Sequence, residues 1–375
     1  MAKSEVDELR DAVREFLAET SPSETVRTLM ATDTGFDATT WRKLAGELGL
    51  TGIAVPETWG GAGAGMTELA VVFEEMGAAL LCAPFFSTVA LAIPALLASG
   101  DRSAIENFVP SLVDGSCTAT LILNDQLGPW NPENVALRAE RGGTRYLIHG
   151  SARQVLDGHT ADIILAAAHT DAGISLFAVL AGAEGLRRTP LAGVDRTRKV
   201  ACVEFDGVAA QPIGTAGDAA DYLARTSDAA IVALAAEQVG AGQRCLDMAV
   251  DYAKNRIQFG RPIGSFQAIK HRCADMLVLI EGARSAASHA ADVADPGELP
   301  TAASVAKMVC SEAFLQVAVD NMRIHGGIGF TWEHDAHLYV RRAKAGQLMF
   351  GSPDYHAQRL AELVGTSSQA LKGLT

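Results

Sequence analysis

The sequence lacks the short motifs that mark several common classes of protein. No G-x-G-x-x-G follows a predicted strand and no G-x-x-x-x-G-K-[ST] is present, so neither a Rossmann cofactor domain nor a P-loop nucleotide domain is predicted. The six cysteines are scattered, without a C-x-x-C pair or a metal-like spacing. They indicate small buried side chains in a reducing compartment.

Positive charge is also scarce. The chain has 31 Lys and Arg against 44 Asp and Glu, a formal net charge of −13. Such a chain repels nucleic acid and anionic membranes, so neither is predicted as a partner, and an anionic ligand would need a local cationic pocket. The N-terminus lacks the apolar core of a signal peptide, and no apolar run reaches the roughly 18 residues of a membrane span. We therefore expect a cytoplasmic protein.

The chain does contain a clear change of pattern along its length. Residues 1–115 show apolar side chains at helical spacings, and residues 116–215 hold short β-prone runs separated by Gly, Asp, Asn and Pro. Helical periodicity returns over residues 216–375. The sequence predicts a mostly α protein with an N-terminal helical domain, a middle β-domain and a C-terminal helical bundle, divided at these boundaries.

Three segments carry specific patterns. Val55–Gly61 reads V-P-E-x-W-G-G, Arg256–Gln267 reads R-x-x-F-G-x-x-I-x-x-F-Q, and Ile324–Asp335 reads I-H-G-G-I-G-F-T-W-E-H-D. In this order and at these separations, the chain resembles the acyl-CoA dehydrogenase family over essentially its whole length. The run E-H-D-A-H-L-Y is similar to the bacterial branch that handles steroid side chains and other bulky acyl-CoA thioesters.

The resemblance implies a β-barrel-like middle domain, a four-helix bundle, and FAD held between the subunits of a homo- or hetero-oligomer, a dimer or tetramer. Arg256 would supply a bidentate cation to the diphosphate and Phe259 a flat apolar face, with Gln267 also at the cofactor. Gly326 and Gly327 would let backbone N–H groups approach the phosphates. Taken alone, these residues have simpler interpretations: a charge compensating a helix end, a core aromatic and a helix stop.

Other positions depart from the family pattern. Arg323 stands where the family commonly has a glutamine that contacts FAD. The loop that usually cups the flavin reads LNDQLGPW (Leu123–Trp130), and Gln154 and Leu156 stand where the family places Trp and Thr beside the flavin ring. The hydroxyl that would bond to the flavin is missing, so the resemblance leaves open whether the chain holds a flavin at its own site.

The catalytic carboxylate is missing from both of its usual places. One family position falls in Met349–Ser352 and the other at Ala230, and neither segment offers a base. Glu237 lies about two helical turns after Ala230 in an apolar stretch, where burial would raise the pKa of a general base. Its alternative role is a buried carboxylate paired with an arginine of a neighbouring helix. Asp228 matches a family position near the acyl-CoA, where it could bond to the pantetheine.

Three histidines near the glycine-rich segment suggest a metal site at first sight. His325, His334 and His337 have a spacing that fits no common zinc pattern. No metal site is predicted.

Three functions remain open. The first is an FAD-dependent acyl-CoA dehydrogenase that forms an α,β-unsaturated thioester and passes electrons to an electron-transfer flavoprotein, with Glu237 as base. The second is a non-catalytic partner subunit that completes the FAD site of a catalytic homologue, as in some α2β2 relatives; the pattern of kept and changed residues slightly favours it. The third is a flavin oxidase or monooxygenase of the same fold.

Overall fold

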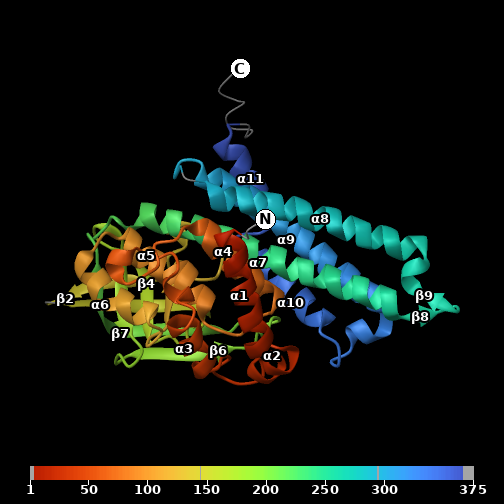
Figure 1. Cartoon of the computed structure of the whole chain (residues 1–375). Coiled ribbons are helices and arrows are strands. Elements are labelled where there is room, and N and C mark those ends of the chain that lie inside the picture. The colour runs from red at the N-terminus through yellow and green to blue at the C-terminus, as the bar shows by residue number, and fades with distance from the viewer. Residues whose placement is uncertain (1–3, 144, 294, 366–375) are drawn as a thin grey trace, which may run out of the picture. The chain divides into compact units, whose positions relative to one another are not determined.

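The computed structural model describes residues 4–143, 145–293 and 295–365 (Figure 1). Before the first strand the chain is helical, as predicted. The helices of this part are α1 (Glu5–Thr20), α2 (Ser23–Leu29), α3 (Ala38–Gly46), α4 (Met66–Ala78), α5 (Ile93–Ala98) and α6 (Arg102–Val113), with short 3-10 turns at Leu50–Gly52 and Glu57–Trp59 and a buried π-helix at Phe86–Ala92. Local caps explain several of the starts, because Ser4, Asp37 and Asp101 accept hydrogen bonds from the first turns that follow them.

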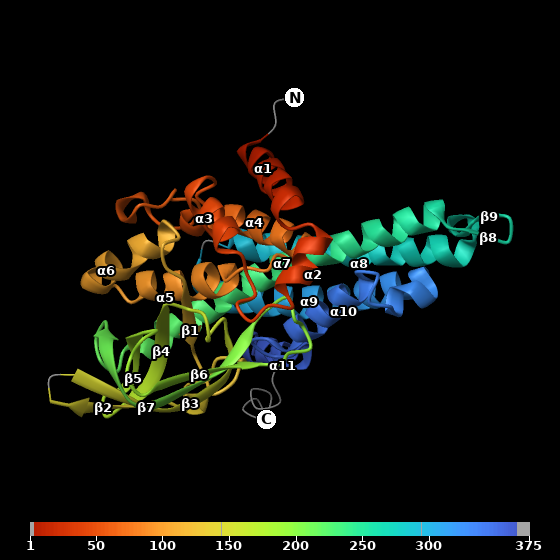
Figure 2. The ribbon, with the colours of Figure 1, turned by 90° about the horizontal axis from the view of Figure 1, so that it is seen from below.

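The middle of the chain forms one seven-stranded sheet (Figure 2). Its strands are β1 (Ala119–Ile122), β2 (Arg138–Gly142), β3 (Arg145–Leu156), β4 (Ile163–Thr170), β5 (Gly173–Leu180), β6 (Leu186–Leu191) and β7 (Val200–Ile213). The pairings β4–β2–β3–β7–β5 return to β4, which closes five strands into a ring, while β1 pairs with β4 and β6 with β7. The predicted β-barrel-like domain is therefore confirmed.

The interior of this ring explains the β-prone runs. Ile148, Phe177, Val203 and Val208 belong to one buried cluster contributed by β3, β5 and β7. Buried and exposed residues alternate along much of β7, as expected for a strand with one face on the core. Burial of apolar side chains on the inward face thus fixes the register of the strands.

The C-terminal part is again helical, apart from one small hairpin. Its elements are α7 (Ala219–Asn255), β8 (Ile257–Gln258), β9 (Arg261–Pro262), a 3-10 turn at Ile263–Ser265, α8 (Gln267–Asp292), α9 (Leu299–His325), a 3-10 turn at Gly326–Phe330, α10 (Ala336–Leu348) and α11 (Pro353–Leu363). In both views α8 runs beside α7, and the β8–β9 hairpin joins their ends (Figures 1 and 2). The predicted helical bundle is confirmed.

Contacts group the described chain into two compact units. One unit takes in residues 4–25, 70–81 and 231–365, and the other takes in residues 26–69 and 82–230. Part of the N-terminal region therefore packs with the C-terminal bundle: Gly77 of α4 lies so close to α7 that a Cβ there would meet the Glu237 carbonyl oxygen. The predicted boundaries at 115 and 215 follow secondary structure, whereas packing groups segments that are distant in sequence.

One helix differs from the expectation that no segment is long and apolar enough to span a membrane. Residues Leu299–Phe330 pass that test by length and composition, with a mean hydropathy of 1.4 in their most apolar window. No uninterrupted apolar run reaches that length, because a few polar residues interrupt this segment. Because 61% of that window is buried inside the protein, its composition is that of a core helix of the bundle.

Candidate functional site

The β8–β9 hairpin presents Phe259 to solvent in a strained turn. Gln258 pairs with Arg261, which leaves Phe259 and Gly260 as a two-residue loop. Their φ values are +55° and +77°, the positive pair that a type I′ turn requires. This conformation is unfavourable for a phenylalanine, and its ring is 89% exposed. Backbone strain of this kind clusters at active sites and ligand clamps.

Arg256 begins this hairpin segment directly after the end of α7. Its backbone N–H donates to the Tyr252 carbonyl at 2.8 Å, and its carbonyl accepts from the Ile263 N–H at 2.8 Å, so the backbone is held from both sides. The guanidinium is exposed and has no ion-pair partner within residues 4–143, 145–293 and 295–365. A fixed backbone with an open guanidinium suits capture of an external anion.

The sequence around Arg256 concentrates positive charge in an acidic chain. Residues 252–274 contain no Asp or Glu and five Lys or Arg, namely Lys254, Arg256, Arg261, Lys270 and Arg272. Arg261 lies over the Phe266 ring at 4.2 Å, which keeps its cation beside the hairpin. This is the local cationic surface that an anionic ligand would need on a chain of net charge −13.

The second predicted contact, the glycine turn, is defined here as Gly326–Phe330. Gly326 ends α9 with φ +66°, and a Cβ added to Gly326 or Gly327 would meet no atom within 4 Å. The backbone on this side therefore borders open space rather than protein interior. An anion can approach it closely, and a side chain at either position would fill the approach.

Arg323 lies one turn before the glycine turn and shares a carboxylate. Asp320 accepts from Arg323 at 3.3 Å and from Arg272 of α8 at 3.2 Å. Two cations on one carboxylate leave a net positive charge, and the Arg323 side chain remains 56% exposed. Arg323 thus provides a cation at the position where the resemblance expected a neutral glutamine. Gln267, the first residue of α8, is also exposed.

These groups fit one end of FAD. The Gly326 N–H donates to the Arg323 carbonyl, so the exposed guanidiniums and the open backbone from Gly327 onward are the groups that a diphosphate could contact, and the Phe259 ring offers an apolar face. All of them belong to one unit of the structure and lie at the ends of α7, α8 and α9. The three predicted elements, cation, aromatic face and bare turn, border solvent rather than interior.

Glu237 has a different setting. It is 4% exposed on α7, and its Oε1 accepts from Arg342 of α10 at 2.9 Å, with both side chains buried. The close contact of α4 with α7 at Gly77 covers the same turn of the helix. This geometry is the ion pair weighed above as the alternative role for Glu237. The sequence did not indicate which arginine would supply the partner, because Arg342 is 105 residues away.

The two family positions for the base carry apolar side chains that are buried. Ala230 is fully buried on α7, and Phe350 is 1% exposed with φ +56°. The Phe350 carbonyl is bonded to His356 Nε2 at 2.9 Å, and the Lys307 ammonium donates to the carbonyls of Gly346 and Gln347 at 2.9 and 3.0 Å. The loop is thus held by bonds to its backbone, and no side chain at either position can accept a proton.

Burial shifts the pKa values of the two ionisable groups beside this loop. Burial lowers the pKa of Lys307 to about 7 and that of His356 to about 4; for His356 the nearby Lys307 and Arg359 charges act in the same direction. His356 is 0% exposed, and its Nδ1 contacts the Ser304 hydroxyl. Both side chains are bonded to backbone carbonyls inside the bundle.

The predicted flavin-side positions lie in the other unit. Asn124 donates from Nδ2 to the Pro129 carbonyl at 2.7 Å, which folds the loop after β1 back on itself. Gln154 is exposed with φ +58° beside an irregularity of the β3–β7 ladder, and Leu156 is buried. Asp228 is buried on α7 in this unit. None of these positions supplies the hydroxyl and indole that the family uses beside the flavin.

The three histidines each contact an aromatic ring. Among the described residues there is no group of three or more His, Cys, Asp or Glu that could hold a metal ion. His325 lies between the rings of Tyr252 and His334, and His337 lies edge-on to Trp332. Tyr252 was not among the residues predicted from the sequence, although both of the histidines in contact belong to the segment that carried the resemblance.

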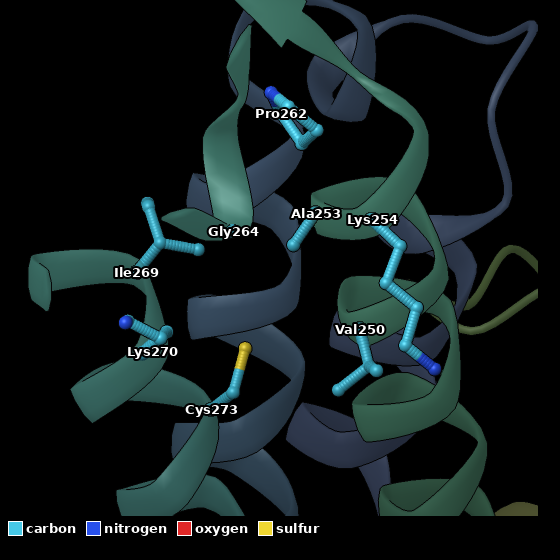
Figure 3. A pocket seen from close by; sticks show the side chains of 8 residues that line it. All are labelled: Val250, Ala253, Lys254, Pro262, Gly264, Ile269, Lys270 and Cys273. Atoms are coloured by element: carbon cyan, nitrogen blue, oxygen red, sulfur yellow. The ribbon is translucent and has the colours of Figure 1, made fainter. Parts of the chain in front are cut away.

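A cavity of about 430 Å³ lies beneath the hairpin, between the last turns of α7 and the first turns of α8 (Figure 3). It is lined by Val250, Ala253, Lys254, Pro262, Gly264, Ile269, Lys270 and Cys273. In Figure 3 the Cys273 sulfur points between the two helices. Burial raises the pKa of this thiol, so it is protonated at neutral pH. The cavity can admit an apolar group but offers no catalytic base.

Comparison with known proteins identifies the family of the chain. The sequence matches the family models described as "Acyl-CoA dehydrogenase, N-terminal domain" over residues 3–116 and "Acyl-CoA dehydrogenase, C-terminal domain" over residues 226–365. It is 34% identical over 359 residues to the acyl-CoA dehydrogenase IpdE2 of Mycobacterium tuberculosis, covering 96% of this chain and 97% of that protein.

Solved structures of acyl-CoA dehydrogenases are similar to this chain over almost its whole length. A variant of the steroid acyl-CoA dehydrogenase Tcur3481–Tcur3483 superposes with a TM-score of 0.85 at 31% identity, covering 99% of both chains. The ChsE4–ChsE5 complex from Mycobacterium tuberculosis superposes with a TM-score of 0.87 at 29% identity, covering 98% of this chain and 99% of that one. From its sequence, its fold and these matches, the chain belongs to the acyl-CoA dehydrogenase family of oxidoreductases.

Proposed function

We propose that this chain is the non-catalytic partner subunit of an FAD-dependent acyl-CoA dehydrogenase. In this function it presents Arg256, Arg323 and the glycine turn to the diphosphate of an FAD whose ring system is held by a catalytic homologue. FAD supplies the hydride acceptor for α,β-dehydrogenation of an acyl-CoA thioester. We further propose that the assembly is cytoplasmic and reduces an electron-transfer flavoprotein.

The observation that carries this proposal is the buried ion pair of Glu237 with Arg342. A general base must reach the proton that it removes, within hydrogen-bonding distance or through one water. Glu237 is 4% exposed and already engaged with a cation of equal burial. With Ala230 and Phe350 at the other two positions, this chain has no candidate base facing a substrate among the residues described in those segments.

The outward-facing groups support the same function. Arg256, Phe259 and the glycine turn keep the pattern of the family and border solvent, as groups offered to a second chain must. Two of the similar solved structures bear paired names, and one of them is a complex of two proteins. We infer a hetero-oligomer in which each pair of chains binds one FAD.

The test is the flavin content of the chain alone and of the chain co-purified with its second subunit. We expect the isolated chain to show almost no flavin absorbance and the co-purified assembly to hold about one FAD for each pair of chains. An isolated chain that carries stoichiometric FAD and is bleached by an acyl-CoA thioester would overturn the proposal. In that case Glu237→Gln, with FAD still bound but bleaching lost, would identify Glu237 as the base of a catalytic homo-oligomer.

A further inference from the structure

Three stacked rings join the ends of three helices in the bundle. Tyr252, in the last turn of α7, lies with its ring centroid 4.3 Å from that of His325 at an interplanar angle of 33°. His325, the last residue of α9, lies 4.2 Å from His334 at 46°. His334 belongs to the segment that leads into α10. Ring pairs at such separations attract each other beyond the area that they bury.

Each end of this stack is bonded to a neighbouring backbone. The Tyr252 carbonyl accepts from the Arg256 N–H at 2.8 Å, and His334 Nδ1 accepts from the N–H of Ala336, the first residue of α10, at 3.1 Å. His325 is followed directly by Gly326. The Tyr252–His325 contact therefore connects the backbone of Arg256 to the start of the glycine turn, and the His325–His334 contact ties the same histidine to the segment that leads into α10.

A hydrogen bond also fixes the orientation of the central ring. His325 Nδ1 lies 2.9 Å from the Asn321 carbonyl, and because a carbonyl only accepts, Nδ1 must carry the proton. Burial lowers the pKa of His325, which keeps this ring neutral near pH 7. A neutral ring can pack against both tilted neighbours without charge repulsion.

We propose that Tyr252, His325 and His334 form a positioning stack that sets the spacing between Arg256 and the glycine turn, so that both contact one diphosphate. This inference rests on the proposed function, because it concerns the same end of FAD. A guanidinium and a backbone turn on separate segments bind one diphosphate well only if their separation is held before binding. The Tyr252–His325 ring pair joins the end of α7 directly to the residue before Gly326.

The experiment measures the affinity of the apo-assembly for FAD and for FMN, which has the same ring system but lacks the diphosphate and adenosine. We expect His325→Leu to lower the affinity for FAD by about tenfold, the order expected when two ring contacts are lost. The affinity for FMN should not change. His325→Phe keeps a flat ring and should recover most of the FAD affinity. Tyr252→Leu removes the ring at one end of the stack and should lower the affinity for FAD to a similar extent.

Two controls separate positioning from general damage. Tyr355 also contacts a histidine ring, at 5.1 Å from His356, but lies on α11, so Tyr355→Leu should leave the ratio of FAD to FMN affinity unchanged. Arg256→Ala tests the proposed function itself and should weaken FAD by roughly 30-fold or more, as expected for loss of a bidentate charged contact.

The outcomes are distinguishable. Loss of FAD affinity in Arg256→Ala, with an unchanged ratio in both His325→Leu and Tyr252→Leu, would overturn the positioning stack and leave the proposed function standing. Equal weakening of FAD and FMN in the two stack variants would also overturn it, because that result indicates a merely structural role. An Arg256→Ala variant that binds FAD normally would overturn the proposed function first.

Discussion

Two regions of the same helical bundle use arginine in opposite ways. Arg342, inside the bundle, is almost fully buried and faces Glu237 at 2.9 Å. Arg256, at the hairpin, has its backbone held on both sides and its guanidinium open to solvent. The first arginine neutralises a carboxylate of its own chain, and the second is available to neutralise a charge that the chain does not supply.

The difference shows how this fold separates stability from ligand binding. A buried charge must be paired within the protein, because the cost of removing it from water is otherwise several kcal/mol. An exposed charge makes no such demand and stabilises the fold little. Changes in the interior should therefore alter unfolding, and changes at the hairpin should alter FAD binding. The following predictions test that division.

The largest effect is expected from breaking the interior pair. Glu237→Gln should lower the free energy of unfolding by about 3–5 kcal/mol, since it leaves the Arg342 charge buried and uncompensated. Denaturant unfolding of the purified chain measures this. The matched control is Glu281→Gln on α8, which removes an exposed carboxylate that pairs with the half-buried Arg284, and it should change stability by less than about 1 kcal/mol. A Glu237→Gln variant as stable as the original chain would contradict the structural role.

A smaller interior effect should appear as a dependence on pH. The folded pKa of His356 is about 4 and its ordinary value is 6.5, so between these values the unfolded state binds more protons than the folded state. The contribution of a neutral His356 to the free energy of unfolding is therefore fully present above pH 6.5. It decreases by on the order of 3 kcal/mol as the pH falls towards 4. Unfolding curves across this range should lose most of that slope in His356→Gln. An unchanged slope would show that His356 is not the group responsible; the exposed His289→Gln serves as control.

The smallest effect belongs to the hairpin and has the opposite sign. Phe259 has φ +55°, a conformation that asparagine tolerates better, so Phe259→Asn should raise the free energy of unfolding by about 1 kcal/mol. The same change removes the exposed ring and should lower the affinity of the assembly for FAD. Ile257→Asn, on the neighbouring exposed strand, should give no gain in stability. If Phe259→Asn lowers stability, the strained turn is maintained for folding rather than for a ligand.

Much of the fold was predictable because it depends on periodicity and local turn chemistry. Helical spacing before residue 115, β-prone runs up to residue 215 and helical spacing afterwards match the observed order of elements. The three motifs identified the family and placed Arg256, Phe259 and the glycine turn at helix ends, where short glycine-rich segments can bring them to the surface. The grouping of residues 4–25 and 70–81 with the C-terminal bundle was not predictable, because it depends on contacts between distant segments.

The sequence by itself determined the order of the elements, the family, and the absence of a base at Ala230 and Phe350, since residue identity and spacing suffice for these. Only the tertiary structure decided the state of Glu237. An apolar helix face around a glutamate indicates burial, but it cannot tell whether the carboxylate faces a substrate or an arginine 105 residues away. Likewise, the ring stack at His325 became visible only when the ends of α7, α9 and α10 were brought together, because stacking depends on distances that no spacing along the chain can specify.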